Sequence, residues 1–174
     1  EIYTLSLHDA LPIWSAGGLG TMGFGLGASI GAALATGKHV VMVTGDGSFA
    51  MNMAELITAV DHHIPVTIVL VNNGVLGMVR QMQSLFMRQR YSNTTLDRRV
   101  DYVAFAKATG AEARRATTPE ELDSALMWAL ATDGPALIEC PIDKDEFVTP
   151  VLQIGASMDE LIVNMDDVQA RMGR

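Results

Sequence analysis

Two short apolar runs, each ending in a cluster of small polar residues, dominate the hydrophobic pattern of this chain. The first run covers residues 40–43 and the second residues 66–71. Neither alternates strictly between apolar and polar positions, which is typical of strands buried on both faces of a parallel sheet. Elsewhere, apolar spacing predicts helices at residues 22–35, 53–62, 79–89, 101–109 and 119–131, a strand at 136–140 and a last helix from Met158. This alternation predicts a doubly wound α/β domain with a mainly parallel sheet and helices on both faces.

Two of the predicted helices carry start signals. Thr118-Pro119-Glu120-Glu121 combines a threonine cap, a proline at the first helical position and a glutamate at the third. Asn52 precedes the helix predicted at 53–62 and is a suitable N-cap residue. We therefore expect these two helices to begin at residues 119 and 53.

The polar clusters lie where the two apolar runs end. Gly45-Asp46-Gly47-Ser48 follows the first run and Asn72-Asn73 the second, with 24 residues between Gly47 and Asn72. Open α/β sheets hold their ligands at the carboxyl ends of the strands. The two clusters therefore predict one shared binding site.

The donor atoms of these clusters suit Mg²⁺, which takes one or two carboxylates and completes its octahedron with other oxygens. Asp46 offers a carboxylate, Asn73 an amide oxygen and Val75 a backbone carbonyl. Gly47 and Ser48 open a helix, and unpaired N–H groups at a helix N-terminus attract anions. Either cluster alone would be an ordinary strand-to-helix turn. Together they favour a site for magnesium and a diphosphate.

The motif resembles the signature of thiamine-diphosphate enzymes, in which Gly-Asp-Gly precedes Asn-Asn by a spacer of this length. Two segments, Gly17-Gly-Leu-Gly-Thr-Met-Gly23 and Asn72-Asn-Gly-Val-Leu-Gly-Met-Val79, are similar to one branch, the acetohydroxyacid (acetolactate) synthase large subunit. The likeness runs from about Trp14 to about Ile162. It implies the fold of the domain that holds the diphosphate end of the cofactor.

The resemblance also implies roles for individual residues. Asp46, Asn73 and the Val75 carbonyl hold Mg²⁺, and Met22 props the cofactor into its bent shape. Met82 stands where the family usually has a tryptophan that lines the pocket for the second substrate. The other implied contacts come from Gly45, Gly47 and Ser48 on the diphosphate and from Gly77 and Met78 on the ring.

The activity implied by the resemblance is decarboxylation of pyruvate and transfer of the remaining two-carbon unit to a second 2-keto acid. That acceptor is pyruvate or 2-ketobutyrate, and the reaction belongs to isoleucine and valine biosynthesis. In the family the activating glutamate lies in a separate N-terminal, pyrimidine-binding domain, usually on the neighbouring subunit. We therefore expect no catalytic acid or base in this chain. Glu55 is a local candidate, but its place along the predicted helix points it elsewhere.

The resemblance further implies a homo-oligomer, allows a regulatory small subunit, and allows FAD to bind elsewhere in the parent enzyme. Two alternatives remain open. Another thiamine-diphosphate enzyme, such as a 2-keto acid decarboxylase or a glyoxylate carboligase, would share the metal ligands and differ in the acceptor. A non-catalytic α/β binding module would use its glycine turns only for packing.

The first 13 residues match, codon for codon, one reading frame of a common sequencing adapter. We expect residues 1–13 to be foreign to the protein. Residues 14–174 then form a C-terminal thiamine-diphosphate-binding domain truncated from a longer enzyme. Such a fragment is expected to lack turnover by itself.

Composition excludes several function classes. Hydrophobic residues make up 49% and charged residues 18%, which indicates a globular protein. The net charge of -8 argues against a nucleic-acid partner. No apolar run approaches the roughly 20 residues that span a membrane. The single cysteine, Cys140, cannot form an internal disulfide and fits a reducing cytoplasm.

Overall fold

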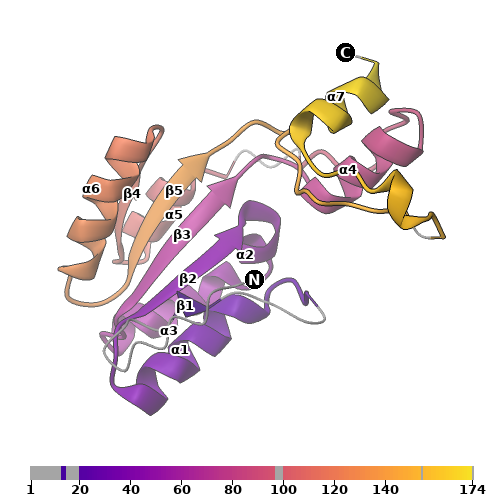
Figure 1. The fold of residues 1–174 in the computed structure, drawn as a ribbon. Helices are drawn as coiled ribbons and strands as arrows, with labels where there is room; N and C mark the ends of the chain where they lie inside the picture. The colour runs from indigo at the N-terminus through magenta and orange to yellow at the C-terminus, as the bar shows by residue number, and fades with distance from the viewer. Residues whose placement is uncertain (1–12, 15–19, 97–99, 154, 174) are drawn as a thin grey trace. The chain divides into compact units, whose positions relative to one another are not determined.

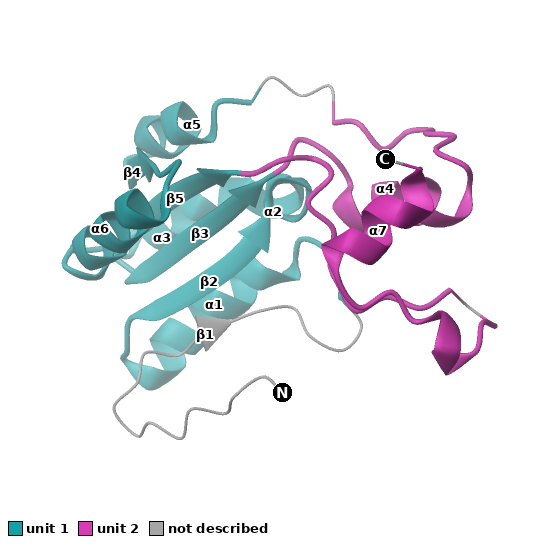
Figure 2. Ribbon diagram, turned by 45° about the horizontal axis from the view of Figure 1, so that its top comes forward, with its two compact units in different colours: residues 1–72, 99–141 teal, residues 73–98, 142–174 magenta. Residues whose placement is uncertain are grey.

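The structure is a computed structural model, and it describes residues 13–14, 20–96, 100–153 and 155–173. The chain divides into two compact units, shown in different colours in Figure 2. Unit 1 contains Glu1–Asn72 and Arg99–Pro141, and unit 2 contains Asn73–Arg98 and Ile142–Arg174. Residues 1–12 of the segment that we expect to be foreign, and Gly17 to Leu19 of the glycine-rich segment, lie outside the described residues.

Unit 1 is built on a sheet whose described strands all run parallel, in the order β1-β2-β3-β5-β4 (Figure 1). The strands are β1 (Ile13–Trp14), β2 (Val40–Gly45), β3 (Val66–Asn72), β4 (Glu112–Arg115) and β5 (Ala136–Pro141). The predicted parallel sheet is thus confirmed, and each predicted strand is present. β1 and β4 were not predicted. β4 is a short edge strand in which only Ala113 is buried, so no apolar run marks it.

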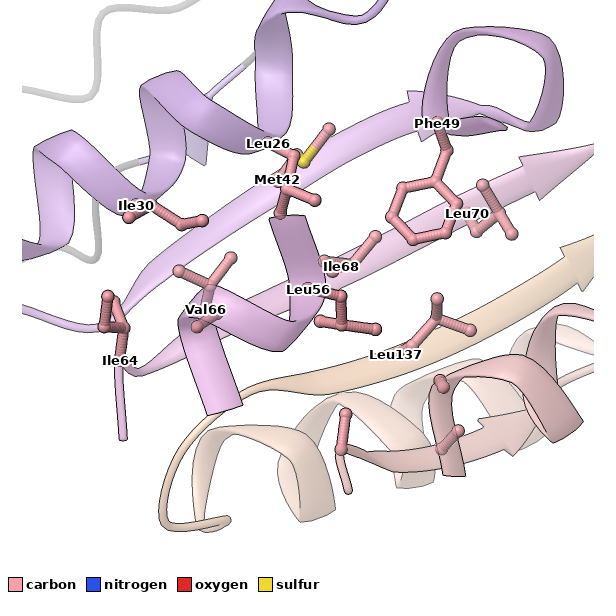
Figure 3. Close-up of a cluster of buried hydrophobic side chains, with 14 of the residues drawn as sticks. Leu26, Ile30, Met42, Phe49, Leu56, Ile64, Val66, Ile68, Leu70 and Leu137 are labelled. Atoms are coloured by element: carbon pink, nitrogen blue, oxygen red, sulfur yellow. The ribbon is translucent and has the colours of Figure 1, made fainter. Parts of the chain in front are cut away.

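Helices cover both faces of this sheet, as predicted. α1 (Phe24–Thr36), α2 (Asp46–Asn52), α3 (Leu56–Asp61) and α5 (Tyr102–Ala108) contribute to the larger buried cluster (Figure 3). α6 (Pro119–Leu130) contributes Ala125 and Ala129 to a separate cluster. Neighbouring residues of β5 join different clusters, Leu137 the first and Ile138 the second. Because side chains alternate along a strand, the two clusters lie on opposite faces.

The helix predicted at 53–62 is wrong in its start. α2 already begins at Asp46, a 3-10 turn covers Met53–Glu55, and α3 begins at Leu56. Asn52 makes no capping hydrogen bond with its side chain. Its amide Nδ2 instead donates to the carbonyl oxygen of Gly23 at 2.9 Å. A contact with a residue far away in the sequence has therefore replaced the local cap.

Unit 2 has its own small core. It contains α4 (Gly77–Phe86), a 3-10 turn at Met158–Glu160 and α7 (Met165–Met172). The predicted helix at 79–89 ends earlier than expected, because Arg88 and Gln89 adopt positive φ angles. The buried hydrophobic side chains of this core are Leu85, Phe147, Val151, Ile162, Val168 and Met172. Within the described ranges, none of the helices has the length and apolar character that crossing a membrane requires.

Candidate functional site

The first polar cluster forms the corner between β2 and α2, at the carboxyl end of β2. Gly45 is extended (φ -87°, ψ 158°) and pairs with Val71 of β3, and α2 begins at the next residue, Asp46. Asp46 is buried, with 4% of its surface exposed. Its backbone carbonyl accepts a hydrogen bond from the Tyr102 hydroxyl at 3.3 Å. The Tyr102 ring packs edge-on against the Phe49 ring, with 6.0 Å between the ring centroids. Contacts between α2 and α5 therefore stabilise this corner.

The loop before α1 is fastened to α2. The Gly23 N–H donates to the Ser48 hydroxyl oxygen at 3.0 Å, and the Gly23 carbonyl accepts from Asn52. Gly23 has a φ of 84°, and a Cβ there would lie 3.0 Å from the Cβ of Met51. Only glycine meets both conditions without strain. These contacts fix the backbone beside Met22, whose side chain is exposed. Because the Ser48 hydroxyl acts as an acceptor toward Gly23, it still has a proton to donate.

The carboxyl end of β3 is held by a carboxylate from β5. Asn72 Nδ2 donates to Glu139 Oε1 at 2.7 Å, and Arg115 reaches Glu139 Oε2 through Nε at 2.9 Å and Nη2 at 2.8 Å. Glu139 is 3% exposed, whereas half of the Arg115 side chain is exposed. The hydrogen bond and the charge of Glu139 raise the pKa of Arg115 above its ordinary value. Sequence reasoning missed both residues; the only signal is a glutamate inside an apolar strand.

In unit 2, the residues after β3 form a tight turn around the Asn73 side chain. Asn73 Oδ1 accepts the Val75 N–H at 3.1 Å, and Gly74 adopts a φ of 66°. Val75 is buried and forms an antiparallel bridge with Thr95. A Cβ on Gly77 would lie 2.8 Å from Asn73 Nδ2. Glycine at position 77 therefore leaves the space that the Asn73 amide occupies.

α4 presents two of the predicted cofactor contacts and buries a third predicted residue in part. Met78, beside Gly77 at the start of the helix, is 56% exposed. Met82 packs against the core of unit 2, which includes Leu85 and Phe147. Its role in a substrate pocket stays a prediction.

The donor chemistry fits Mg²⁺ together with a diphosphate. Among the described residues, no group of three or more His, Cys, Asp or Glu side chains could hold a metal ion. If Asp46, Asn73 and a backbone carbonyl were to hold a divalent cation, the ion would need further negative charge, which diphosphate oxygens would supply. Asn73 Oδ1 keeps a second lone pair for a metal while it accepts the Val75 N–H.

Two other reactive side chains do not form a catalytic site of their own. Glu55 is exposed on the 3-10 turn, where it accepts a hydrogen bond from the Thr58 hydroxyl at 3.0 Å. Burial raises the pKa of the Cys140 thiol, and the charge of Glu139 adds to this effect. A thiol with a raised pKa is a poor nucleophile, because the thiolate is the reactive form.

A family model described as "Thiamine pyrophosphate enzyme, C-terminal TPP binding domain" matches residues 4–140. Thiamine pyrophosphate is another name for thiamine diphosphate. The chain therefore belongs to the thiamine pyrophosphate enzyme family, of which it carries the C-terminal, cofactor-binding domain. The match begins inside residues 1–13, and the foreign origin of that segment stays a prediction.

Three relatives narrow the resemblance. The chain is 45% identical over 146 residues to the acetolactate synthase isozyme 2 large subunit of Escherichia coli, a match that covers 83% of this chain and 27% of the relative. It is 43% identical over 149 residues to the mitochondrial acetolactate synthase catalytic subunit of Saccharomyces cerevisiae, covering 85% and 22%. The isozyme 1 large subunit of E. coli is 40% identical over 149 residues, covering 85% and 26%. The chain thus spans about a quarter of the length of these relatives.

A solved structure supports the same fold. The thiamine diphosphate-dependent 4-hydroxybenzoylformate decarboxylase of Rhodococcus jostii RHA1 superposes with a TM-score of 0.65 and 32% sequence identity. The superposition covers 70% of this chain and 23% of the decarboxylase. The doubly wound α/β fold and the resemblance to thiamine-diphosphate enzymes are thus both confirmed.

Proposed function

We propose that this chain is the cofactor-binding domain of an acetolactate synthase large subunit. The observation that carries the proposal is the 40–45% identity to three proteins named acetolactate synthase, over more than four-fifths of the chain. The parent enzyme would decarboxylate pyruvate and join the two-carbon remainder to pyruvate or 2-ketobutyrate. Bound thiamine diphosphate would supply the carbanion chemistry of both steps.

The residues of this chain would bind and orient that cofactor. Asp46, Asn73 and the Val75 carbonyl would hold Mg²⁺, and the magnesium would neutralise the diphosphate. Gly45, Gly47 and Ser48 would approach the phosphate oxygens from the β2–α2 corner, where the Ser48 hydroxyl has a proton to donate. Backbone N–H groups at a helix start add to the attraction for an anion.

The remaining contacts would act on the organic part of the cofactor. Met22 would support its bent conformation, and Gly77 and Met78 would lie against its ring. The exposure of Met22 and Met78 supports this assignment, because large apolar side chains at the surface are free to cover a ligand. Met82 would line the acceptor pocket.

No acid or base that activates the cofactor is assigned to this chain. The activating glutamate would come from the pyrimidine-binding domain, usually on a neighbouring subunit, so the working enzyme would be a homo-oligomer. A regulatory small subunit and a bound FAD elsewhere in the parent enzyme are compatible with this arrangement. We also keep a cytoplasmic location as a prediction.

A 2-keto acid decarboxylase is the second candidate, and one observation favours it. The superposed R. jostii structure is a thiamine diphosphate-dependent decarboxylase that acts on a 2-keto acid. A parent enzyme of this second kind would use the same Mg²⁺ and diphosphate contacts, but it would release an aldehyde. Product identity therefore separates the two candidates.

The first experiment tests cofactor binding by the 174-residue chain. Thiamine diphosphate is titrated calorimetrically into the protein with Mg²⁺ and, separately, with a chelator. Binding that requires Mg²⁺ is expected. Absence of binding under both conditions would favour a non-catalytic module.

The second experiment tests the reaction. Residues 14–174 replace the matching segment of the E. coli isozyme 2 large subunit, and the products formed from pyruvate are identified. Acetolactate is the expected product, and acetaldehyde without acetolactate would favour the decarboxylase. Residues 14–174 alone should form no acetolactate.

A further inference from the structure

We propose that Glu139 is a positioning residue for the Mg²⁺ ion, acting through the Asn72 side chain while Arg115 holds the Glu139 carboxylate in place. The inference rests on the proposed function, because it concerns the same magnesium and diphosphate site. All three residues belong to unit 1, and their contacts join three neighbouring strands. None of the three is among the predicted ligands.

The strand register explains why these side chains meet. Glu139 of β5 pairs with Leu70 of β3 on one side and with Arg115 of β4 on the other. Paired residues of parallel strands project from the same face of a sheet, and Asn72 lies two residues beyond Leu70 on that face. Each carboxylate oxygen of Glu139 has its own partner: Oε1 accepts a hydrogen bond from Asn72 at 2.7 Å, and Oε2 accepts from Arg115.

The Asn72–Glu139 contact forms where the pairing of β3 with β5 ends. Asn72 is the last residue of β3 and pairs with Pro141. The side-chain hydrogen bond from Asn72 to Glu139 therefore adds a link between β3 and β5 at the last pair of residues of the two strands.

The next residue after Asn72 is Asn73, the proposed amide ligand. A ligand to Mg²⁺ must be placed accurately, because this small ion demands near-ideal octahedral geometry. Fixing the last residue of β3 fixes the start of the segment that carries the ligand. Mutation of residues that position a ligand without touching the metal typically lowers metal affinity by about 10- to 100-fold.

The test measures metal affinity in the 174-residue chain and in variants. Mn²⁺ serves as the probe, since it prefers the same oxygen ligands and its free concentration can be read by electron paramagnetic resonance. Titrations are run with saturating thiamine diphosphate on wild type, Glu139→Ala, Glu139→Gln, Asn72→Ala and the Asn72→Ala/Glu139→Ala double variant. Thermal midpoints without cofactor are recorded for each.

Glu139→Ala and Asn72→Ala should each weaken Mn²⁺ binding by about tenfold. The double variant should be no weaker than either single variant, because Glu139 acts through Asn72. Glu139→Gln, which keeps an oxygen to accept from Asn72, should remain closer to wild type. Glu139→Gln should also destabilise the fold less than Glu139→Ala does, because glutamine preserves the volume of the side chain.

A purely structural role is tested with a matched control. Thr118→Ala removes the hydrogen bond from the Glu121 N–H to the Thr118 hydroxyl oxygen, which caps α6 in unit 1. It should lower the thermal midpoint without changing Mn²⁺ affinity. If Thr118→Ala weakens Mn²⁺ binding as much as Glu139→Ala, or if the two single effects multiply in the double variant, the positioning role is wrong.

Failure of the inference and failure of the proposed function give different results. If wild type binds Mn²⁺ with thiamine diphosphate and Glu139→Ala binds equally well, the inference fails and the function stands. If wild type binds no Mn²⁺ in the presence of thiamine diphosphate, the proposed function fails, and the inference fails with it.

Discussion

Gly77→Ala is the substitution that most cleanly separates metal binding from stability. Gly77 is the first residue of α4, and its φ angle is not in the left-handed region, so alanine fits the backbone. The added Cβ would lie 2.8 Å from Asn73 Nδ2, whereas ordinary contacts begin at 3.4 Å. The Asn73 amide would have to withdraw by roughly 0.6 Å to reach ordinary van der Waals contact.

The effects on stability should nearly cancel. Alanine in place of glycine favours a helix by up to about 1 kcal/mol. Against this, moving the amide weakens the hydrogen bond that Asn73 Oδ1 accepts from Val75, and such a bond contributes about 1 kcal/mol. The free energy of unfolding should therefore change by less than about 1 kcal/mol in either direction.

The effect on metal binding should be much larger. Mg²⁺ binds its ligands at about 2.1 Å with little tolerance, so a displacement of this size takes Asn73 Oδ1 out of the coordination sphere. We expect magnesium-dependent binding of thiamine diphosphate to weaken by about tenfold or more, and each tenfold corresponds to about 1.4 kcal/mol. Calorimetry measures the affinity, and urea denaturation measures the stability.

Gly31→Ala is the matched control. Gly31 lies within α1, and a Cβ there would meet nothing within 4 Å. It should gain up to about 1 kcal/mol in stability with unchanged cofactor affinity. If Gly77→Ala binds Mg²⁺ and thiamine diphosphate as tightly as Gly31→Ala, Asn73 is not a ligand and the reasoning fails.

Three further predictions follow from the same contacts. Asp46→Asn removes the single proposed carboxylate ligand and should weaken magnesium-dependent binding by about 100-fold, measured by calorimetry; unchanged affinity would exclude Asp46 as a ligand. Burial lowers the pKa of His39 below its ordinary 6.5, so stability should fall as the pH drops below that value, because the unfolded chain takes up the proton first. His39→Gln should flatten this dependence in urea denaturation, and an unchanged slope would contradict it. Met82→Trp in the grafted enzyme should shift the ratio of products formed from pyruvate and 2-ketobutyrate, and an unchanged ratio would exclude a role of residue 82 in choosing the acceptor. Because Met82 packs against the core around Phe147, the larger side chain should also lower the free energy of unfolding by about 1–3 kcal/mol.

The inner strands of the central sheet could be predicted because they are apolar along most of their length, although only β3 is buried on both faces and β2 alternates between buried and more exposed positions. β2 and β3 are nearly continuous apolar runs, and such runs arise where helices cover both sides of a parallel sheet. β4 could not be predicted in the same way. It lies at the sheet edge and reads Glu-Ala-Arg-Arg, so its strand character depends on pairing with β5.

The start of the helix predicted at 53–62 was missed because a distant contact replaced the local cap. Asn52 has the right chemistry for an N-cap, but its side chain binds Gly23, 29 residues earlier in the chain. Local capping rules cannot include such a partner. The side chains of Thr118 and Asp101 each cap the helix that follows them, by accepting a hydrogen bond from a backbone N–H in its first turn.

The sequence was enough to propose the ligands of the candidate site, but it gave no access to the contacts that support them. Asp46 and Asn73 could be proposed as ligands because each follows directly on a strand, and chain order alone gives that position. The link from Asn72 to Glu139 and Arg115 depends on β5 lying between β3 and β4, and this order follows from the tertiary fold.

The most direct test of this account is a crystal structure of the chain grown with Mg²⁺ and thiamine diphosphate. The account predicts one octahedral ion with an Asp46 carboxylate oxygen and Asn73 Oδ1 both at about 2.1 Å, and with diphosphate oxygens in the same sphere. An ion that lacks either side chain, or a diphosphate held elsewhere in the protein, would contradict it.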